Sequence, residues 1–180
     1  MNSKVGKEII EWIKSLMIAG IIAVIIHTFL FAIVIVDGPS MEPTLQSSER
    51  LILNKISYII SEPERGDIVV FHANEADDYI KRIIGLPGET VEVKNDQLFI
   101  NGEIVLEPYL DKEKEDIHSS GELLTADFGP VEVQEEQLFV MGDNRRNSTD
   151  SRILGTISME NLMGKTNIII FPFNKFGKIE

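Results

Sequence analysis

Ser40 stands in a turn-forming stretch, Gly38-Pro39-Ser40, and is a candidate nucleophile. A serine hydroxyl is a weak nucleophile unless a base takes its proton, and histidine is the most familiar base. His72 ends an apolar run without an evident carboxylate partner, and His118 lies in a charged stretch. Glu42 replaces the second glycine of a G-x-S-x-G elbow, and the S-x-x-K and H-E-x-x-H motifs are absent from the chain. The common serine-hydrolase and metalloprotease patterns are therefore missing.

Lysine is the other known base for serine, and it acts only as the neutral amine. A free lysine has a pKa of about 10.4, but burial disfavours the ammonium form and lowers this pKa. Lys81 is the best-placed lysine because it lies in the apolar run 79–84. On a strand its side chain shares one face with Tyr79 and Ile83, which favours desolvation. The competing interpretation is an ordinary strand lysine whose amine extends to solvent.

A polar block, GDNRRNSTDSR at residues 142–152, follows the apolar run 138–141 directly. It combines small hydroxyl and amide side chains with two aspartates and three arginines. Such a run can fold as a turn held by its own side chains, and it can supply partners that orient a catalytic amine. A polar surface loop is the alternative that the pattern leaves open.

Four blocks together resemble the type I signal peptidases, in the order and at the spacing of that family. They are Ser40-Met41-x-Pro43-Thr44-Leu45, Arg65-Gly66-Asp67-Ile68-Val69, Tyr79-Ile80-Lys81-Arg82-Ile83-Ile84-Gly85-x-Pro87-Gly88 and Gly142-Asp143-Asn144-Arg145-x-Asn147-Ser148-x-Asp150-Ser151-Arg152. The resemblance implies a Ser-Lys dyad endopeptidase that removes signal peptides from secreted preproteins, cutting after small residues at −1 and −3. It also implies a mostly β fold, with an all-β catalytic domain of coiled antiparallel sheets.

The resemblance also assigns roles to individual residues. Ser40 would attack the scissile carbonyl, and Lys81 would act as general base. Ser148 would hydrogen-bond the Lys81 amine. The ion pairs Arg82–Asp143 and Arg152–Asp150 would support the site. Val36 and Ile80 would line pockets for small substrate side chains.

Gly38 departs from one branch of the family. Some members carry a serine at this position, and its hydroxyl helps to stabilise the oxyanion. Glycine is common in the single-span, Gram-positive type, so we interpret Gly38 as a mark of that type. The expected oxyanion hole consists of the Ser40 backbone N–H and whatever the Gly38 region or a water supplies.

Residues 15–36 carry no formal charge and are long enough for a membrane-spanning helix, which needs about 20 residues. A cleavable signal peptide is the alternative, but β-branched residues stand at 33–36, where a cleavage site needs small ones. Lys4, Lys7 and Lys14 favour a cytoplasmic N-terminus. We therefore expect a cytoplasmic segment at 1–14, a signal anchor at 15–36 and an extracytoplasmic peptidase domain at 37–180, with the lipid bilayer as a partner and a single-pass cell-membrane location.

The chain is acidic, with 17 Lys and Arg against 29 Asp and Glu and a net charge of −12. This charge argues against nucleic-acid binding. There is no cysteine, which excludes disulfides and thiolate metal sites. We expect neither a cofactor nor a metal.

Short apolar runs separated by turn residues predict strands at 51–53, 68–71, 79–84, 137–141 and 166–171. Residues 90–94 and 97–100 read as a tight hairpin, and a second hairpin follows through Asn101-Gly102 into 104–105. Residues 109–127 are charged and mixed in sign, so we expect a solvated loop with little fixed structure.

Two other functions are compatible with parts of the pattern. A self-cleaving regulator shares the Ser-Lys chemistry, but it needs a DNA-binding domain or an internal cleavage segment. A membrane-tethered, non-catalytic binding module predicts that Ser40→Ala and Lys81→Ala leave function intact. The secretory preprotein is the partner that the peptidase interpretation requires.

Overall fold

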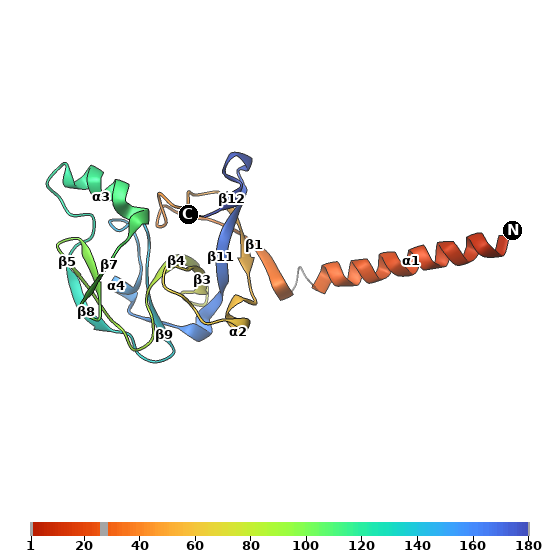
Figure 1. The fold of residues 1–180 in the computed structure, drawn as a ribbon, viewed down its shortest axis with the longest axis horizontal. Coiled ribbons are helices and arrows are strands. Elements are labelled where there is room, and N and C mark those ends of the chain that lie inside the picture. Colours follow the sequence, from red (N-terminus) through yellow and green to blue (C-terminus); the bar gives the residue numbers. More distant parts are fainter. Residues whose placement is uncertain (1, 26–28, 180) are drawn as a thin grey trace.

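The computed structural model describes residues 2–25 and 29–179. A long helix, α1 (Asn2–Ile25), extends away from a β-rich domain (Figure 1). Within the described ranges, no helix is both long enough and apolar enough to cross a bilayer. The domain itself begins at strand β1 (Phe31–Ile35), earlier than the predicted boundary at residue 37.

The expected helix over residues 15–36 is therefore wrong at its C-terminal end. Residues 26–28 lie outside the described part, and residues 31–35 pair with β2 (Arg50–Asn54) as an antiparallel strand. The sequence FAIVI is apolar and rich in β-branched residues, which favours a strand. An apolar run of this length cannot be divided into helix and strand from hydropathy alone.

The larger sheet is antiparallel and positions the candidate catalytic residues, with Lys81 on one of its strands and Ser40 on a turn between two others. Its order is β1, β2, β11, β3, β4, β9 and β10, and β12 pairs with β11. The strands not yet given bounds are β3 (Ile68–His72), β4 (Asp78–Gly85), β9 (Gln137–Met141), β10 (Ile157–Ser158), β11 (Leu162–Phe171) and β12 (Gly177–Lys178). All five strands predicted from apolar runs lie in this sheet.

A four-stranded antiparallel sheet forms the other part of the domain (Figure 1). Its order is β7 (Glu103–Val105), β6 (Gln97–Ile100), β5 (Thr90–Lys94) and β8 (Phe128–Glu132). Both predicted hairpins are confirmed. The first turn, Asn95-Asp96, has φ values of 48° and 62°, the left-handed pair of a two-residue hairpin loop.

Short helices fill the connections between the strands. They are α2 (Ser57–Ile60), η2 (Pro108–Leu110), α3 (Asp111–His118), α4 (Ser151–Leu154), η3 (Met159–Asn161) and η4 (Phe173–Lys175). The prediction of a structureless loop at 109–127 is wrong, because η2 and α3 occupy its first half. Lys114 donates to the Asp96 carbonyl and His118 contacts the Asp96 carboxylate, so α3 is held by contacts distant in sequence.

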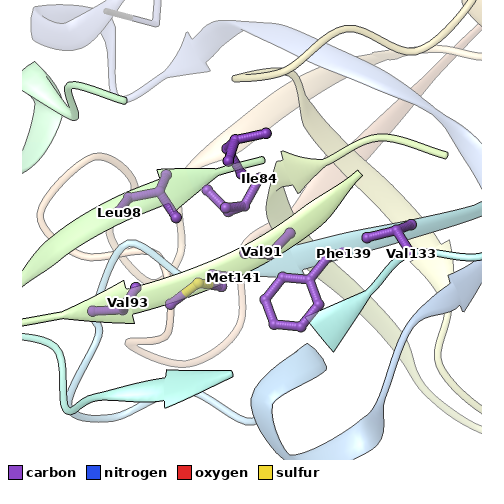
Figure 2. Packing of buried hydrophobic residues seen from close by; sticks show 8 residues of the cluster. Ile84, Val91, Val93, Leu98, Val133, Phe139 and Met141 are labelled. Atoms are coloured by element: carbon purple, nitrogen blue, oxygen red, sulfur yellow. The ribbon is translucent and has the colours of Figure 1, made fainter. Parts of the chain in front are cut away.

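Three apolar clusters hold the domain together. One joins the four-stranded sheet to β4 and β9 (Figure 2), and it consists of Ile84, Val91, Val93, Leu98, Ile100, Val133, Phe139 and Met141. A second consists of Val36, Met41, Leu45, Leu51, Ile68 and Ile169. The third consists of Val69, Phe71, Ile83, Leu138, Val140 and Ile157. The second cluster contains residues on both sides of Ser40 and so anchors the segment that carries it.

Candidate active site

Ser40 lies on a compact turn between β1 and β2. The N–H of Glu42 donates to the Pro39 carbonyl at 3.0 Å, and the N–H of Leu45 donates to the Met41 carbonyl at 2.9 Å. The Met41 and Leu45 side chains are buried in the second cluster. The apolar packing of Met41 and Leu45 therefore holds the turn in place, while Ser40 remains partly exposed.

The Lys81 side chain reaches Ser40 from β4. Its Nζ lies 2.9 Å from Ser40 Oγ and donates to the Ile80 carbonyl, also at 2.9 Å. Lys81 is only 3% exposed, and its Nζ lies 4.9 Å from the centre of the Tyr79 ring. The amine points into the protein, so the structure contradicts the alternative that Lys81 is an ordinary strand lysine whose amine extends to solvent.

Burial lowers the pKa of Lys81 to about 8, and the carboxylates of Asp150 and Asp143 oppose this shift. Because the ammonium loses hydration in this site, the neutral amine is favoured relative to a free lysine. A neutral amine within hydrogen-bond distance of a hydroxyl has the geometry of a general base and its nucleophile.

The polar block 142–152 folds beside Ser40 and is tied down by Asp150. This fully buried carboxylate accepts from the Gly142 N–H at 3.0 Å and from Arg152 Nε and Nη2 at 2.8 and 2.7 Å. Burial alone would raise the pKa of Asp150, but Arg152 and the Gly142 N–H bring it below the ordinary value. Arg152 also donates to the Arg145 carbonyl at 2.6 Å. The predicted Asp150–Arg152 pair is confirmed.

A second buried ion pair links the block to β4. Arg82 donates from Nε and Nη2 to the two carboxylate oxygens of Asp143, at 2.9 and 2.6 Å. Its Nη1 donates to the Gly66 carbonyl at 3.0 Å. Thr44, four residues after Ser40, donates its hydroxyl to Asp143 at 2.5 Å. The predicted Asp143–Arg82 pair is confirmed, and the hydrogen bonds of these two side chains join all four motif blocks.

Ser148 does not make the predicted bond. The Lys81 amine bonds to Ser40 and the Ile80 carbonyl, while Ser148 Oγ is buried and has no partner of regular hydrogen-bond geometry among the described residues. The hydroxyl lies near Asp150 and contributes to lowering the pKa of that carboxylate. Gly142 Cα lies against it, because a Cβ at Gly142 would overlap Ser148 Oγ and the Ser40 carbonyl. Ser148 is thus beside the site without contacting the amine.

An open cleft of about 460 Å³ runs along Ser40 and Lys81. Its lining includes the end of β1, the start of β4 and the polar residues Asn147 and Thr149. Val36 and Ile80 both contribute to the lining, and both pack on the second apolar cluster. Gly38 also lines the cleft, with a φ of +85°, and a methyl group on its Cα would meet no atom within 4 Å.

The comparison with known sequences agrees with this geometry. The family described as signal peptidase, peptidase S26, matches residues 9–171. The chain belongs to the signal peptidase S26 family.

Individual members of the family are similar over nearly the whole chain. Signal peptidase I of Bacillus amyloliquefaciens is 50% identical over 171 residues, covering 94% of this chain and 92% of that protein. Signal peptidase I S of Bacillus subtilis (strain 168) is 49% identical over 179 residues, covering 98% and 97%. The crystal structure of a signal peptidase I from Enterococcus faecalis V583 is 39% identical, has a TM-score of 0.54, and covers 59% of this chain and 97% of that one.

The histidines considered as alternative bases are engaged elsewhere in this family member. His72 Nδ1 lies 2.6 Å from an Asp78 carboxylate oxygen, and His118 Nε2 lies 2.7 Å from Asp96. Among the described residues, no group of three or more His, Asp or Glu side chains has the arrangement of a metal site.

One functional contact was missed from the sequence although its residue lies in a motif block. Asn144 donates its backbone N–H to the Ser40 carbonyl at 3.1 Å and its side-chain amide to the Pro39 carbonyl, also at 3.1 Å. Asn144 therefore holds the nucleophile turn against the polar block. Its position directly after Asp143 is the only signal that pointed to this contact.

Proposed function

We propose that the protein is a membrane-bound serine endopeptidase that removes N-terminal signal peptides from secreted preproteins by a Ser-Lys dyad. The observation that carries the proposal is the 2.9 Å contact between Lys81 Nζ and Ser40 Oγ in a buried site. Family membership supports the reaction class, and the bacterial relatives named signal peptidase I support the substrate class.

In the proposed mechanism the neutral Lys81 amine takes the Ser40 proton as Oγ attacks the scissile carbonyl. The resulting ammonium then gives this proton to the leaving amine, and an acyl-enzyme remains on Ser40. Lys81 next activates a water, whose attack on the ester releases the signal peptide and regenerates the serine. The Ser40 backbone N–H and the Gly38 region would surround the oxyanion.

The cleft supports the proposed preference for small residues at −1 and −3. Val36 and Ile80 would form its apolar floor, and both are held by the cluster beneath them. Strand β1 is at the edge of the larger sheet, paired with β2 alone among the described strands. An extended substrate segment can bind such an edge through main-chain hydrogen bonds, with alternate side chains directed into pockets.

The membrane attachment is also a proposal. Exposed apolar side chains surround the second half of α1, including Leu16, Met17, Ile18, Ile21, Ile22 and Val24. An exposed apolar helix of this kind requires an apolar environment such as lipid. With Lys4, Lys7 and Lys14 on the cytoplasmic side, the β-rich domain would face the outside of the cell membrane.

Intact-mass analysis of a secretory preprotein incubated with the full-length protein in detergent tests the dyad directly. Wild type should yield a mature product shortened after a small-x-small site. Ser40→Ala and Lys81→Ala should both abolish this product, while Lys94→Ala, which removes an exposed amine paired with Glu92, should not. Cleavage that survives Lys81→Ala would show that another group is the base, and intact preprotein with wild type would favour a non-catalytic binding module.

A further inference from the structure

Glu107 and Tyr109 lie outside the four motif blocks, yet both contact arginines of the catalytic region. They belong to the segment that leaves the four-stranded sheet after β7 and enters η2. Glu107 is only 5% exposed, although it is a charged residue. A buried carboxylate is retained in a fold only where it has charged or hydrogen-bonding partners.

The main partner of Glu107 is Arg145 of the polar block. The Arg145 side chain is completely buried and pairs with Glu107 Oε1 through a short contact of its Nη2. The remaining contacts of this guanidinium are Glu107 Oε2 at 3.4 Å, Thr125 Oγ1 at 3.4 Å and Tyr109 Oη at 3.1 Å. The Tyr109 hydroxyl in turn donates to Glu107 Oε1 at 2.9 Å.

Tyr109 also contacts the other side of the site. The centre of its ring lies 4.0 Å from the guanidinium carbon of Arg82. Arg82 directly follows Lys81 on β4 and pairs with Asp143. A guanidinium stacked on a buried aromatic ring gains cation–π attraction as well as packing. Residues 107 and 109 thus contact an arginine on β4 and an arginine in the polar block.

The charges at this contact persist at neutral pH. Burial would raise the pKa of Glu107, but the charge and hydrogen bonds of Arg145, together with Lys114 at 3.3 Å, lower it below the ordinary value. Burial would lower the pKa of Arg145, but Glu107 raises it. A buried ion pair often stabilises a fold no more than apolar residues of similar volume would. We therefore ask which groups the Glu107–Arg145 pair holds in place, and not how much stability it adds.

We propose that Glu107 and Tyr109 are positioning residues: they hold Arg145 and Arg82 so that the polar block 142–152 keeps the Ser40 turn against Lys81. The link is short, because Asn144, the neighbour of Arg145, bonds to the Ser40 and Pro39 carbonyls. Neither residue lines the cleft along Ser40 and Lys81, so both act on the site through the two arginines. This inference rests on the proposed peptidase function.

The substitution Glu107→Gln leaves Arg145 as a buried charge without a carboxylate partner. We expect the block to shift, the Asn144 contacts to lengthen, and kcat to fall roughly 10–100-fold with little change in KM. Water then reaches the Lys81 amine, which otherwise contacts Ser40, the Ile80 carbonyl and the Tyr79 ring and is influenced by the charges of Asp143 and Asp150. Because desolvation lowers the pKa of Lys81, its loss moves the acid limb of kcat/KM to higher pH.

Tyr109→Phe and Glu122→Gln make the comparison specific. Tyr109→Phe removes the hydroxyl contacts to Glu107 and Arg145 but keeps the ring over Arg82, so we expect a smaller change in the same direction. Glu122→Gln is the matched control, because Glu122 pairs with Arg146, the next arginine of the same block, and both side chains are at least half exposed. This variant should keep the wild-type profile.

The experiment measures kcat, KM and thermal unfolding of the full-length protein in detergent, with a peptide substrate carrying small residues at −1 and −3. The assays run from about pH 6 to about pH 11, which covers the ordinary and the lowered pKa of lysine. The inference is supported by a folded Glu107→Gln variant with reduced kcat and an acid limb raised by about half a pH unit or more. If the acid limb of kcat/KM in folded Glu107→Gln stays at the wild-type pH, the inference is overturned, whatever the loss of activity.

If Glu107→Gln does not fold, Tyr109→Phe decides the question, and a wild-type profile for that folded variant overturns the inference. Absence of cleavage by wild type is a different result. It would refute the proposed peptidase function, and the positioning role would fall with it.

Discussion

The Lys81 amine is subject to opposing influences at the scale of single residues. Burial lowers its pKa to about 8, while Asp150 and Asp143 favour the ammonium form. Both carboxylates are already paired, with Arg152 and Arg82 respectively, which limits their pull on the amine. With a pKa near 8, roughly a tenth of the amine is neutral at pH 7, against less than about a thousandth for a free lysine.

A pH–rate profile of wild type tests this value. If the neutral amine is the base, as we propose, kcat/KM should rise with pH through an acid limb near pH 8 and level off above it. A limb near 6.5 would instead indicate a histidine. The same profile measured with His72→Ala distinguishes Lys81 from His72 as the base, and we expect it to match that of wild type.

Asp150→Asn tests the electrostatic balance around Lys81 from the other direction. The loss of a buried ion pair partner should lower kcat/KM and reduce stability by about 3–5 kcal/mol, because Arg152 keeps its charge. In the active fraction that remains, the acid limb should move to lower pH, since the carboxylate raises the pKa of Lys81. Thermal unfolding and the pH–rate profile measure the two effects separately. A limb that stays in place in the folded variant would contradict this electrostatic role.

At the scale of elements, two glycines with close neighbours should respond differently to alanine. At Gly142 a methyl group would meet the Ser40 carbonyl and Ser148, so Gly142→Ala should lower kcat/KM roughly 10²-fold by displacing the nucleophile turn. At Gly85 a methyl group would meet Val91, Phe139 and Val133 in the apolar core, so Gly85→Ala should cost about 1–3 kcal/mol of stability. Kinetics and thermal unfolding of both variants check this contrast, and equal losses of stability without a difference in activity would refute it.

The elements that the sequence predicted correctly are those specified by nearby residues. The hairpin 90–100 is closed by Asn95-Asp96, whose positive φ values suit these two residue types. The ion pairs Arg82–Asp143 and Arg152–Asp150 were expected only through the family resemblance. The pairing of β4 with β9 brings Arg82 close to Asp143, whereas Asp150 and Arg152 are two residues apart at the start of α4. The Ser148 bond to Lys81, expected on the same basis, is not formed: the amine contacts Ser40 and the Ile80 carbonyl, and Ser148 Oγ has no partner of regular hydrogen-bond geometry among the described residues.

The elements that the sequence did not predict depend on distant partners. Helix α3 has no buried residues of its own and an almost uniformly charged sequence, so its pattern resembles a solvated loop. It is held instead by Asp96 and Glu107, which accept from Lys114. Likewise, residues 31–35 become a strand because β2 offers a pairing edge, information that the hydropathy of the run does not contain. Glu107 and Tyr109 gave no sequence signal of their contact with Arg145 for the same reason.

At the scale of the whole molecule, the segment between α1 and Ser40 is short. Strand β1 begins at Phe31 and ends at Ile35, and Ser40 follows on the next turn. The side chains of Ile33 and Ile35 are each 60% exposed, and Phe173 is 81% exposed. If α1 is held in lipid, as we propose, these exposed apolar side chains and the cleft lie close to the bilayer surface, where a preprotein emerges.

A variant that lacks residues 1–28 tests whether this arrangement matters for function. Its β-rich domain keeps all three apolar clusters and the dyad, so we expect a folded protein that cleaves a soluble peptide in detergent with wild-type kcat/KM. Cleavage of a preprotein embedded in lipid vesicles should fall by roughly 10²-fold or more, because enzyme and substrate are no longer confined to one surface. Flotation of the vesicles measures membrane association in parallel. Equal preprotein cleavage by both forms would refute the anchoring role, whereas loss of peptide cleavage would show that the first 28 residues support the fold of the site.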